Sequence, residues 1–449
     1  MKRVITEVCP LIALTLIFIQ PLHAASTLTA DEARITAAEA FVYGFGPILL
    51  ESYRQARMQV LGAPNHMVYA ASPDTHRTMG YFAGYLDLSK EPVVLCLPDV
   101  SEQKVMLEVM GAYADVIRVQ GLPPPRGSGC WAVTGPGWEG RLPTGMAEVR
   151  SPTNGAWIFG RTLMEGPQDK ETHETFMGRC SLTPLSRFTR GSRTTPSATG
   201  EGLLPTSPVR QVLLMDMQAF FGRLALFMKR TPPPASDTEI VGRMARIGID
   251  ARNGFFDTTG FSPAARKAIE QGMKEGMDKI RKHVWEGTPK RDGWMVIASH
   301  PNGTDYLGRS VAAYAGLGEP LAGGATVVVR RIDEAGNRLN GAGRYVLHLD
   351  EDHLELSRDQ WSLAVLDADL CPLPRRIQRT ALGGLDGLQT GSDGSVEILI
   401  QKNSPGPDRE SNWLQVPERE FTVMMRTYGI GEPDQNGGIL YPSVERMEE

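Results

Sequence analysis

"SPDTHRTMGYFAGYLDLSKEPVVLCLP", residues 72–98, decides the fold of the first half of the chain. It opens with a polar, proline-containing turn and ends in a short apolar run, 93–97, in which valine and leucine dominate. Further short apolar runs follow at 105–110 and 156–159, and Gly/Pro clusters such as "GLPPPRGSG" (121–129) separate them. Apolar runs divided by turn residues predict several short strands, which form a β-sandwich or a barrel.

The same pattern returns in the last third of the chain. "ATVVVRRID" (325–333) is followed by "WSLAVLD" and "FTVMMRTYG", which begin at Trp361 and Phe421. We therefore expect two β-sandwiches, one over 66–190 and another over 323–449. Because each of the two aromatic residues opens an apolar run, we expect both to lie in the core of the second sandwich.

Helical periodicity marks the segments outside these two regions. Thr29 and Glu32 form a T-x-x-E capping box. Apolar residues follow at three- and four-residue steps, which predicts one buried helix face: Ile35, Ala38, Val42, Phe45 and Leu49. An N-terminal helix is expected over 26–65, weakened by the glycines and the proline of 44–47. With a linker and further helices expected over 191–322, the chain is predicted to be an α+β multidomain protein.

The first residues have the pattern of a secretory signal peptide. Lys2 and Arg3 precede an apolar segment at 8–19, and small residues follow at 24–25. The apolar segment is shorter than the roughly 20 residues that a transmembrane helix needs. We therefore expect residues 1–25 to be removed, the protein to be periplasmic or secreted, and the mature chain to have no transmembrane segment.

Composition and motifs argue against several classes of protein. The net charge is −5 and the lysines and arginines are scattered, which argues against a nucleic-acid-binding surface. Removal of Cys9 with the signal peptide leaves cysteines that are far apart, so we expect at most one or two disulfides and no zinc ribbon. The sequence has no H-E-x-x-H, G-x-S-x-G, P-loop or Rossmann glycine motif. His348 and His353 flank the acidic turn "HLDEDH" (348–353), and such a set could bind a metal, but acidic turns of this kind are usually solvated, so no metal site is predicted. The sequence identifies no cofactor and leaves the oligomeric state open.

An ordered set of motifs spans nearly the whole mature chain. The motifs are Asp74-Thr75, "LDLSKEPVVLCLPD" (86–99), "SLTPLSRF" (181–188), "PPP…D" (232–237), "GTDYLGRSVAAYAGLG" (303–318), "DGSVEILIQ" (393–401) and "NWLQVP" (412–417). In this set and order the chain resembles proteins that pair domain-of-unknown-function family 1254, in the N-terminal half, with family 1214, in the C-terminal half. The resemblance implies two jelly-roll-like β-sandwiches joined by a helical region. It implies no settled activity.

Asp74, Thr75 and His76 stand together just before the first predicted strands. An aspartate in a turn accepts backbone N–H bonds, and on this interpretation the segment is a turn that starts the first β-domain. On the alternative interpretation Asp74 acts as a general base or an orienting acceptor, and its two neighbours contact the substrate.

A second polar group, Asp305, Tyr306 and Arg309, lies at the start of a predicted helix. Asp305 and Arg309 are four residues apart, so their side chains can face the same side and pair. One interpretation is a salt bridge between domains. The other is the mouth of a site at a domain interface, where Arg426 or Trp413 from the second sandwich would join them.

Two classes of function follow from these residues. The first is a periplasmic hydrolase or lyase that acts on a small molecule or a saccharide by carboxylate and tyrosine chemistry, with Asp74, Asp305 and Tyr306 as catalytic residues. The substrate would then be bound by five further residues: Thr75, His76, Arg309, Trp413 and Arg426. The second class is a non-catalytic periplasmic or envelope-associated ligand-binding protein. β-Sandwiches host both roles, so convergent Asp, Tyr and Arg side chains in the structure would favour the enzyme.

Overall fold

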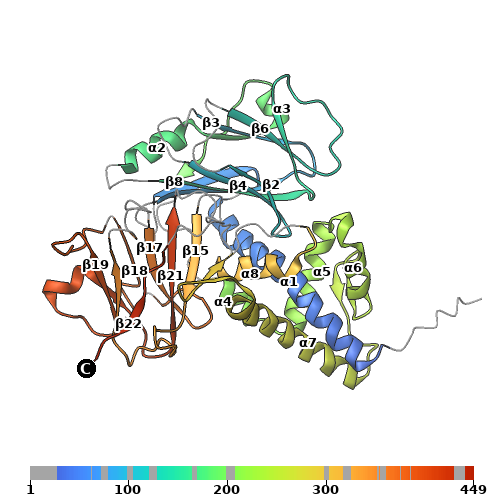
Figure 1. Cartoon of the computed structure of the whole chain (residues 1–449). Helices are drawn as coiled ribbons and strands as arrows, with labels where there is room; N and C mark the ends of the chain where they lie inside the picture. Colours follow the sequence, from blue (N-terminus) through green and yellow to red (C-terminus); the bar gives the residue numbers. More distant parts are fainter. Residues whose placement is uncertain are drawn as a thin grey trace, which may run out of the picture.

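A computed structural model describes residues 28–61, 63–71, 79–98, 105–120, 129–163, 169–198, 208–297, 303–316, 325–350, 353, 361–374, 376–384, 386–428 and 440–448. The predicted signal peptide lies outside these described residues, as do Asp74, Thr75 and His76. Figure 1 shows two β-rich parts, one above the other, and a helical part beside the lower one. The chain therefore has the α+β, multidomain organisation that its sequence predicts.

The upper part is a β-sandwich. Its larger sheet has the order β10-β1-β2-β8-β4-β5, with strands at Ser197–Ala198, His66–Ala71, Met79–Asp87, Gly155–Leu163, Val105–Gly111 and Val116–Gln120. Its smaller sheet has the order β7-β6-β3-β9, with strands at Ala147–Arg150, Gly129–Thr134, Val93–Leu97 and Ser181–Pro184. Helices α2 (Asp169–Arg179) and α3 (Leu185–Phe188) complete this part. Phe82 and Ile158 of the larger sheet pack with Leu95 and Val133 of the smaller sheet in one core.

One disulfide links two strands of the smaller sheet. Cys96 of β3 lies directly opposite Cys130 of β6, and the two form a disulfide. Cys180 and Cys371 are buried free thiols. The sequence predicted at most one or two bridges, and the described residues contain this one.

The lower β-rich part is a second sandwich. Its larger sheet has the order β13-β14-β15-β21-β17-β18, with strands at Lys290–Arg291, Trp294–Ile297, Ala325–Arg330, Phe421–Tyr428, Trp361–Asp367 and Ala381–Gly383. Its smaller sheet has the order β20-β19-β16-β22, with strands at Trp413–Gln415, Val396–Gln401, Tyr345–Leu349 and Val444–Arg446. A short helix, η3 (Pro407–Asn412), precedes β20. Trp361 and Phe421 are each 1% exposed in the core between the sheets, which confirms that prediction. Jelly-roll connectivity stays a prediction.

The helical part contains the N-terminal helix and the segment between the sandwiches. Its helices are α1 (Ala30–Leu61), α4 (Pro208–Leu213), α5 (Met217–Arg230), η1 (Ala235–Asp237), α6 (Thr238–Ala245), α7 (Pro263–Lys282), η2 (His283–Gly287) and α8 (Tyr306–Ala315). A small hairpin of β11 (Ile249–Asp250) and β12 (Phe255–Phe256) accompanies them. Two strands from this stretch of sequence, β13 and β14, join the larger sheet of the second sandwich.

Helix α1 begins as predicted but does not weaken as predicted. The N–H and the hydroxyl of Thr29 both donate to the carboxylate of Glu32, whose own N–H donates to the Thr29 hydroxyl. The helix then runs through Pro47 without a break, so the expected weakening is wrong. Every residue of 40–50 is buried, and this packing outweighs a local proline penalty of about 3 kcal/mol. Ile35 is 47% exposed and is not part of the buried face.

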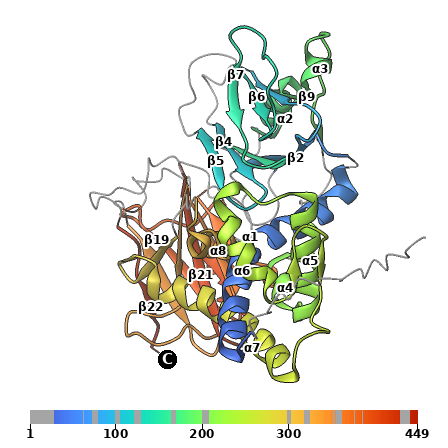
Figure 2. The same ribbon diagram turned by 90° about the vertical axis from the view of Figure 1, so that its right-hand side faces the viewer.

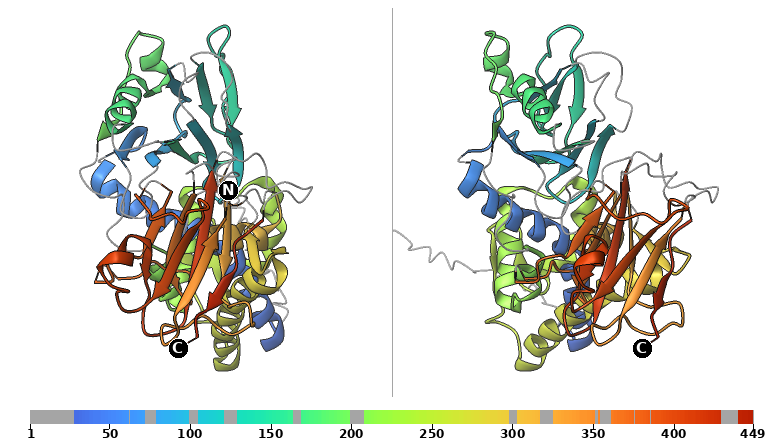
Figure 3. Two further views of the ribbon diagram at one scale, coloured as in Figure 1. Left: turned by 60° about the vertical axis from the view of Figure 1, so that its left-hand side comes forward. Right: turned by 90° about the vertical axis from the view of Figure 1, so that its left-hand side faces the viewer.

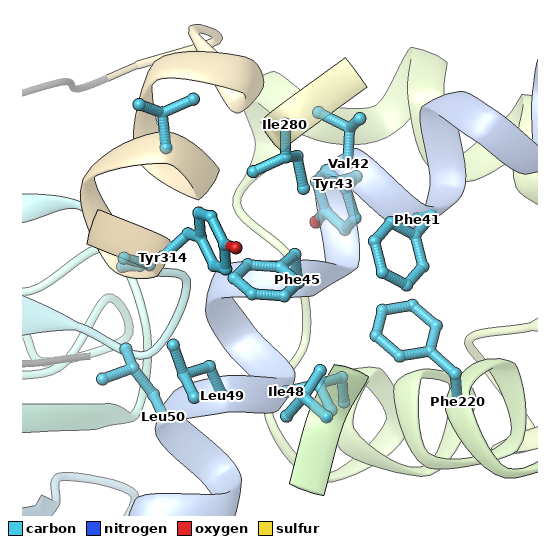
Figure 4. Packing of buried hydrophobic residues seen from close by; sticks show 14 of the residues in the cluster. Phe41, Val42, Tyr43, Phe45, Ile48, Leu49, Leu50, Phe220, Ile280 and Tyr314 are labelled. Atoms are coloured by element: carbon cyan, nitrogen blue, oxygen red, sulfur yellow. The ribbon is translucent and has the colours of Figure 1, made fainter. Parts of the chain in front are cut away.

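The middle of helix α1, residues 40–50, lies in the apolar core of the helical part. Figure 4 shows Phe41 and Phe45 of α1 among Phe220 of α5, Ile280 of α7 and Tyr314 of α8. The ring centroids of Phe41 and Phe220 are 4.5 Å apart.

The same core includes one face of the larger sheet from each sandwich. Ala83 and Trp157 come from the first, and Val327 and Met424 come from the second. Figures 2 and 3 show the first sandwich above both the helices and the second sandwich. The helical part thus joins the two sandwiches through a shared apolar core.

Candidate functional site

Polar side chains from four separate segments meet beside helix α1. They are Tyr43 of α1, Tyr113 of the turn between β4 and β5, Asp237 at the end of η1, and Tyr306 and Arg309 of α8; we call these five residues the tyrosine cluster. The ring centroid of Tyr43 lies 5.7 Å from that of Tyr113 and 5.1 Å from that of Tyr306. Three aromatic hydroxyls, one carboxylate and one guanidinium therefore share one small region.

Local sequence explains how two of these segments begin. The prolines of 232–234 follow the end of α5, and Asp237 stands at the junction of η1 and α6. At α8, the side chain of Asp305 accepts a hydrogen bond from the N–H of Gly308 at 2.9 Å. This N-cap satisfies a donor that the first turn of a helix leaves free, and it fixes where Tyr306 and Arg309 emerge.

Asp237 is the acceptor that holds the cluster together. Its side chain is buried, and its Oδ2 accepts a hydrogen bond from the hydroxyl of Tyr43 at 3.1 Å. Its Oδ1 accepts from the hydroxyl of Tyr306 at 3.1 Å and from that of Ser236 at 2.9 Å. A buried carboxylate is stable only when its oxygens are hydrogen-bonded, so these donors and this acceptor stabilise one another.

The three phenols keep their protons at neutral pH. Burial raises the pKa of Tyr306 to about 12, and the nearby charge of Asp237 acts in the same direction. Burial likewise raises the pKa of Tyr43 and of Tyr113 well above the ordinary value for tyrosine. The cluster therefore contains neutral hydroxyl groups and no phenolates. Tyr43 and Tyr306 donate their hydroxyl protons to Asp237, and Tyr113 donates its own to the carbonyl of Thr231 at 2.7 Å.

Arg309 brings a positive charge into this region. Its residue is 5% exposed, and its guanidinium carbon lies 5.0 Å from the ring centroid of Tyr306, a cation–π distance. Among the residues that the structure describes, none accepts a hydrogen bond from this guanidinium. Its charge acts on Tyr43, Tyr113 and Asp115. A buried guanidinium without a hydrogen-bonded acceptor is suited to an anion.

Asp115 is a second carboxyl group within the field of Arg309. Burial raises its pKa, and the charge of Arg309 opposes this shift. Its Oδ1 is buried and accepts no hydrogen bond. It follows Ala114, which has a left-handed backbone with φ at 61°, in the tight turn that also carries Tyr113. This strained turn places a phenol and a carboxyl group side by side at the edge of the cluster.

Only some of the site residues predicted from the sequence lie in the tyrosine cluster. Tyr306 and Arg309 lie together in the cluster. Asp305, in contrast, caps its own helix, and no ion pair joins it to Arg309, although the structure describes both residues. The expected pair is therefore wrong, because the carboxylate of an N-cap residue turns towards the backbone N–H groups of the first turn.

The two candidates from the second sandwich lie in different sheets. Trp413 is in β20 of the smaller sheet, where its indole N–H donates to the carbonyl of Gln401 at 2.8 Å. Among the described residues of that sheet, none belongs to the core around α1. Arg426 is buried in β21, directly between Val327 and Ser362 of the neighbouring strands. Asp74, Thr75 and His76 stay predictions, because they lie outside the described residues.

Sequence reasoning missed three members of the cluster. Asp237 is the final residue of "PPP…D" (232–237), one of the motifs that carry the family resemblance. Tyr43 follows Val42, which belongs to the predicted apolar face of the N-terminal helix. Its position therefore predicts a residue at the edge of that face, packed against the core. Tyr113 stands between two strand-like runs, in "GAYAD" (111–115), where it reads as a turn residue. Of these three residues, only Asp237 belongs to a motif of the family resemblance, and that motif could have pointed to it.

Within the described residues, no group of three or more His, Cys, Asp or Glu side chains could hold a metal ion. No helix in the described part of the chain has both the length and the apolar character needed to cross a membrane.

Comparisons with known proteins give two family matches. The family model described as "Protein of unknown function (DUF1254)" matches residues 58–184, and that described as "Protein of unknown function (DUF1214)" matches residues 324–432. Together they match just over half of the chain. No curated protein matches it significantly.

One solved structure that the chain resembles gives a likeness of fold. The chain is similar to the VPA0106 protein from Vibrio parahaemolyticus, with 19% identity and a TM-score of 0.58 over 94% of this chain and 100% of that chain. A putative uncharacterized protein from Burkholderia cenocepacia has 11% identity and a TM-score of 0.39, over 93% of this chain and 95% of that chain. The first likeness supports the arrangement of the two sandwiches and the helices.

Proposed function

The chain belongs to the family that pairs DUF1254 with DUF1214, and from its site we propose that it is an exported hydrolase or lyase that acts on a small acidic molecule or an acidic saccharide. One observation carries this proposal: Arg309 is buried among three protonated phenols and donates to no acceptor in the described part of the chain. Perturbed ionisable groups that converge from separate elements are typical of active sites.

Arg309 is the group that would bind the acidic substrate. A guanidinium offers paired N–H donors that match a carboxylate, and burial strengthens the interaction because water does not screen it. The phenol of Tyr306, which is only partly buried, stands next to this position and can bond a hydroxyl of the substrate. Binding by Arg309 would therefore place the reacting part of the substrate against Tyr306.

Tyr306 and Asp237 supply a route for a proton. As the phenolic oxygen of Tyr306 takes a proton from the substrate, its own proton can pass to Oδ1 of Asp237, 3.1 Å away. The reverse transfer would protonate a leaving group. Tyr306 is then the catalytic residue that touches the substrate, and the buried Asp237 acts through it as a positioning residue. Asp305 contributes only by capping α8.

Export is part of the proposal. It rests on the signal-peptide pattern and gains support from the Cys96–Cys130 disulfide, because disulfides persist in oxidising compartments such as the periplasm. N-terminal sequencing of the protein from its native host should begin just after residue 24 or 25. An intact N-terminus in the membrane fraction would contradict export.

The proposed activity is tested with three variants of the mature protein. Mono- and dicarboxylic acids and uronic-acid saccharides are screened by thermal shift and then for turnover. Arg309→Gln should lose the thermal shift, and Tyr306→Phe should keep it while losing turnover. Tyr345→Phe, which removes a buried hydroxyl near Asn340 in the second sandwich, is the matched control and should keep both.

The same variants also distinguish the proposed enzyme from the alternative function. A non-catalytic ligand-binding protein would show a thermal shift that depends on Arg309 and no turnover with any bound compound. A full thermal shift in Arg309→Gln would refute the site itself.

A further inference from the structure

Asp115 has a carboxyl group whose hydrogen bonding the chain only partly satisfies. Backbone N–H groups of Asp115 itself and of Tyr113 donate to this group. Its Oδ1 atom, in contrast, is buried and has no hydrogen-bond partner in the described part of the chain. A buried carboxylate oxygen without a donor is costly, so Oδ1 is suited to a donor that comes from outside the chain.

The turn that carries Asp115 leaves a defined space for its carboxyl group. The carbonyl of Asp115 accepts a hydrogen bond from the N–H of Gly111 at 2.8 Å, and the carbonyl of Gly111 accepts one from the N–H of Ala114 at 3.2 Å. A Cβ at position 111 would lie only 2.4 Å from Oδ1 of Asp115. Glycine at this position therefore provides the space that the carboxyl group occupies.

The same turn lies close to the helix that carries Arg309. A Cβ on Gly46 of α1 would lie 3.0 Å from the Cβ of Ala114 and 3.8 Å from the Cβ of Ala313. Ala114 directly precedes Asp115, and Ala313 lies one helical turn after Arg309. The turn and α8 therefore approach the same point of α1, which brings Asp115 near Arg309.

Asp115 and Arg309 have opposite charges but do not form a pair. The charge of Arg309 acts on Asp115, yet no ion pair joins the two side chains, although the structure describes both. Arg243, another cation whose charge reaches Tyr306, is already paired with Glu39 and Glu239. The region therefore holds a carboxylate oxygen without a donor and, within the described residues, a guanidinium without an acceptor.

The charges here favour a ligand that has a positive group as well as a carboxylate. The tyrosine cluster and Asp115 together contain one guanidinium and two carboxyl groups, those of Asp237 and Asp115. A ligand with only a carboxylate would neutralise Arg309 and be repelled by both carboxylates. An ammonium group on the same ligand would donate to Asp115 and offset one negative charge, whereas a hydroxyl group would supply a donor without the charge.

We propose that the acidic molecule bound by Arg309 is a small amino acid, whose carboxylate accepts hydrogen bonds from Arg309 and whose ammonium group donates to Oδ1 of Asp115. This inference rests on the proposed function and adds to it a class of substrate and a second binding residue. Asp115 and Tyr306 are partly exposed, whereas the other members of the cluster are buried. A ligand that approaches from solvent therefore meets Asp115 and Tyr306 first.

The experiment compares pairs of probes that differ only in the ammonium group. Glycine, β-alanine and 4-aminobutyrate are paired with acetate, propionate and butyrate, and their affinities for the full mature protein are measured by isothermal titration calorimetry. The measurements are made at about pH 7, where the amino compounds are zwitterions. In the wild type at least one amino compound should bind about tenfold more tightly than its partner, as expected for a hydrogen bond between charged groups.

Two variants of the turn test the role of Asp115. Asp115→Asn keeps a carbonyl oxygen for the backbone N–H groups but replaces the other oxygen with an NH2 group, so the two members of each pair should bind within about twofold of each other. Gly111→Ala keeps the carboxyl group but adds a methyl group in its space, so the preference for the ammonium group should shrink. Gly178→Ala, where a Cβ would meet nothing within 4 Å, is the matched control and should keep the full preference.

Arg309→Gln separates this inference from the proposed function, because it should weaken the binding of every probe. If the amino compounds bind no better than their partners, while the binding and turnover of other acids still depend on Arg309, the inference is refuted and the proposed function stands. A preference that survives in Asp115→Asn also refutes the inference. Unchanged binding of all probes in Arg309→Gln would refute both. Circular dichroism of each variant checks that the fold is intact.

Discussion

Replacing Asp237 with asparagine tests whether this carboxylate organises the tyrosine cluster. Tyr43 donates to one of its oxygens, and Tyr306 and Ser236 donate to the other. Asparagine keeps one acceptor oxygen and replaces the second with an NH2 group, which can only donate. The two phenols therefore cannot both keep their acceptor.

The loss of stability can be worked from these bonds. A hydrogen bond to a charged group contributes about 1.5–3 kcal/mol, and one between neutral groups contributes about 0.5–1.5 kcal/mol. Asp237→Asn loses one phenol bond and converts the other from charged to neutral, so the free energy of unfolding should fall by about 2–4 kcal/mol. Tyr43 is 2% exposed, so water cannot replace its acceptor. Turnover should fall about tenfold or more, because Tyr306 loses its proton partner.

Asp333→Asn is the matched control. Asp333 is also buried, at 2% exposed, but it accepts hydrogen bonds from Asn337 within one turn of the second sandwich. This variant should lose stability without losing turnover. Urea unfolding of Asp237→Asn, Tyr306→Phe and the double variant should give a coupling energy of about 1–2 kcal/mol. Additive losses would show that Asp237 and Tyr306 do not act as a unit and would refute the reasoning.

Three further outcomes are expected. Gly160→Ala would place a Cβ 1.8 Å from the ring of Phe82, so it should cost about 1–3 kcal/mol, and an unchanged melting temperature would contradict this packing. Glu108→Gln should flatten the pH dependence of stability. Burial raises the pKa of Glu108 in the folded protein from 4.5 to about 8. The stability that protonated Glu108 contributes is therefore complete below about pH 4.5 and is lost as the pH rises through about 8. The free energy of unfolding should fall by about 5 kcal/mol at most over this range. Urea unfolding at the two ends of that range measures the loss. Replacing Cys96 and Cys130 together with serine opens a loop of 34 residues and should cost about 3–4 kcal/mol, whereas equal stability with and without reductant would contradict it.

Local features of the fold could be predicted from the sequence. The capping box of Thr29 and Glu32 involves residues three apart, and its hydrogen bonds form as expected. Trp361 and Phe421 are buried because strand patterns report which side chains face a core. The continuity of α1 through Pro47 could not be predicted, since it depends on packing with segments that are remote in sequence.

The site was predictable only in part, for the same reason. Tyr306 and Arg309 are close in sequence and lie on one helix, so their proximity follows from helical spacing. Asp237 is 69 residues from Tyr306 and 194 residues from Tyr43, and no local pattern links them. Glu108 stands in "VMLEVMG" (105–111), where alternation alone would place it in water. Its burial results from the packing of the other face of the sheet against the helices.

Glycine at position 46 of α1 explains why the cluster forms where it does. A Cβ on Gly46 would lie 3.0 Å from the Cβ of Ala114, and one on Gly44 would lie 2.7 Å from a methyl group of Leu224. The Ala114 Cβ is fixed by its backbone, so glycine at position 46 lets α1 approach the turn between β4 and β5 this closely, whereas the Leu224 methyl group could move to admit a Cβ at position 44. That turn carries Tyr113, and Tyr43 lies on the adjoining part of α1. One of the residues that predicted a weak point in the helix thus allows two distant segments to bring their phenols together.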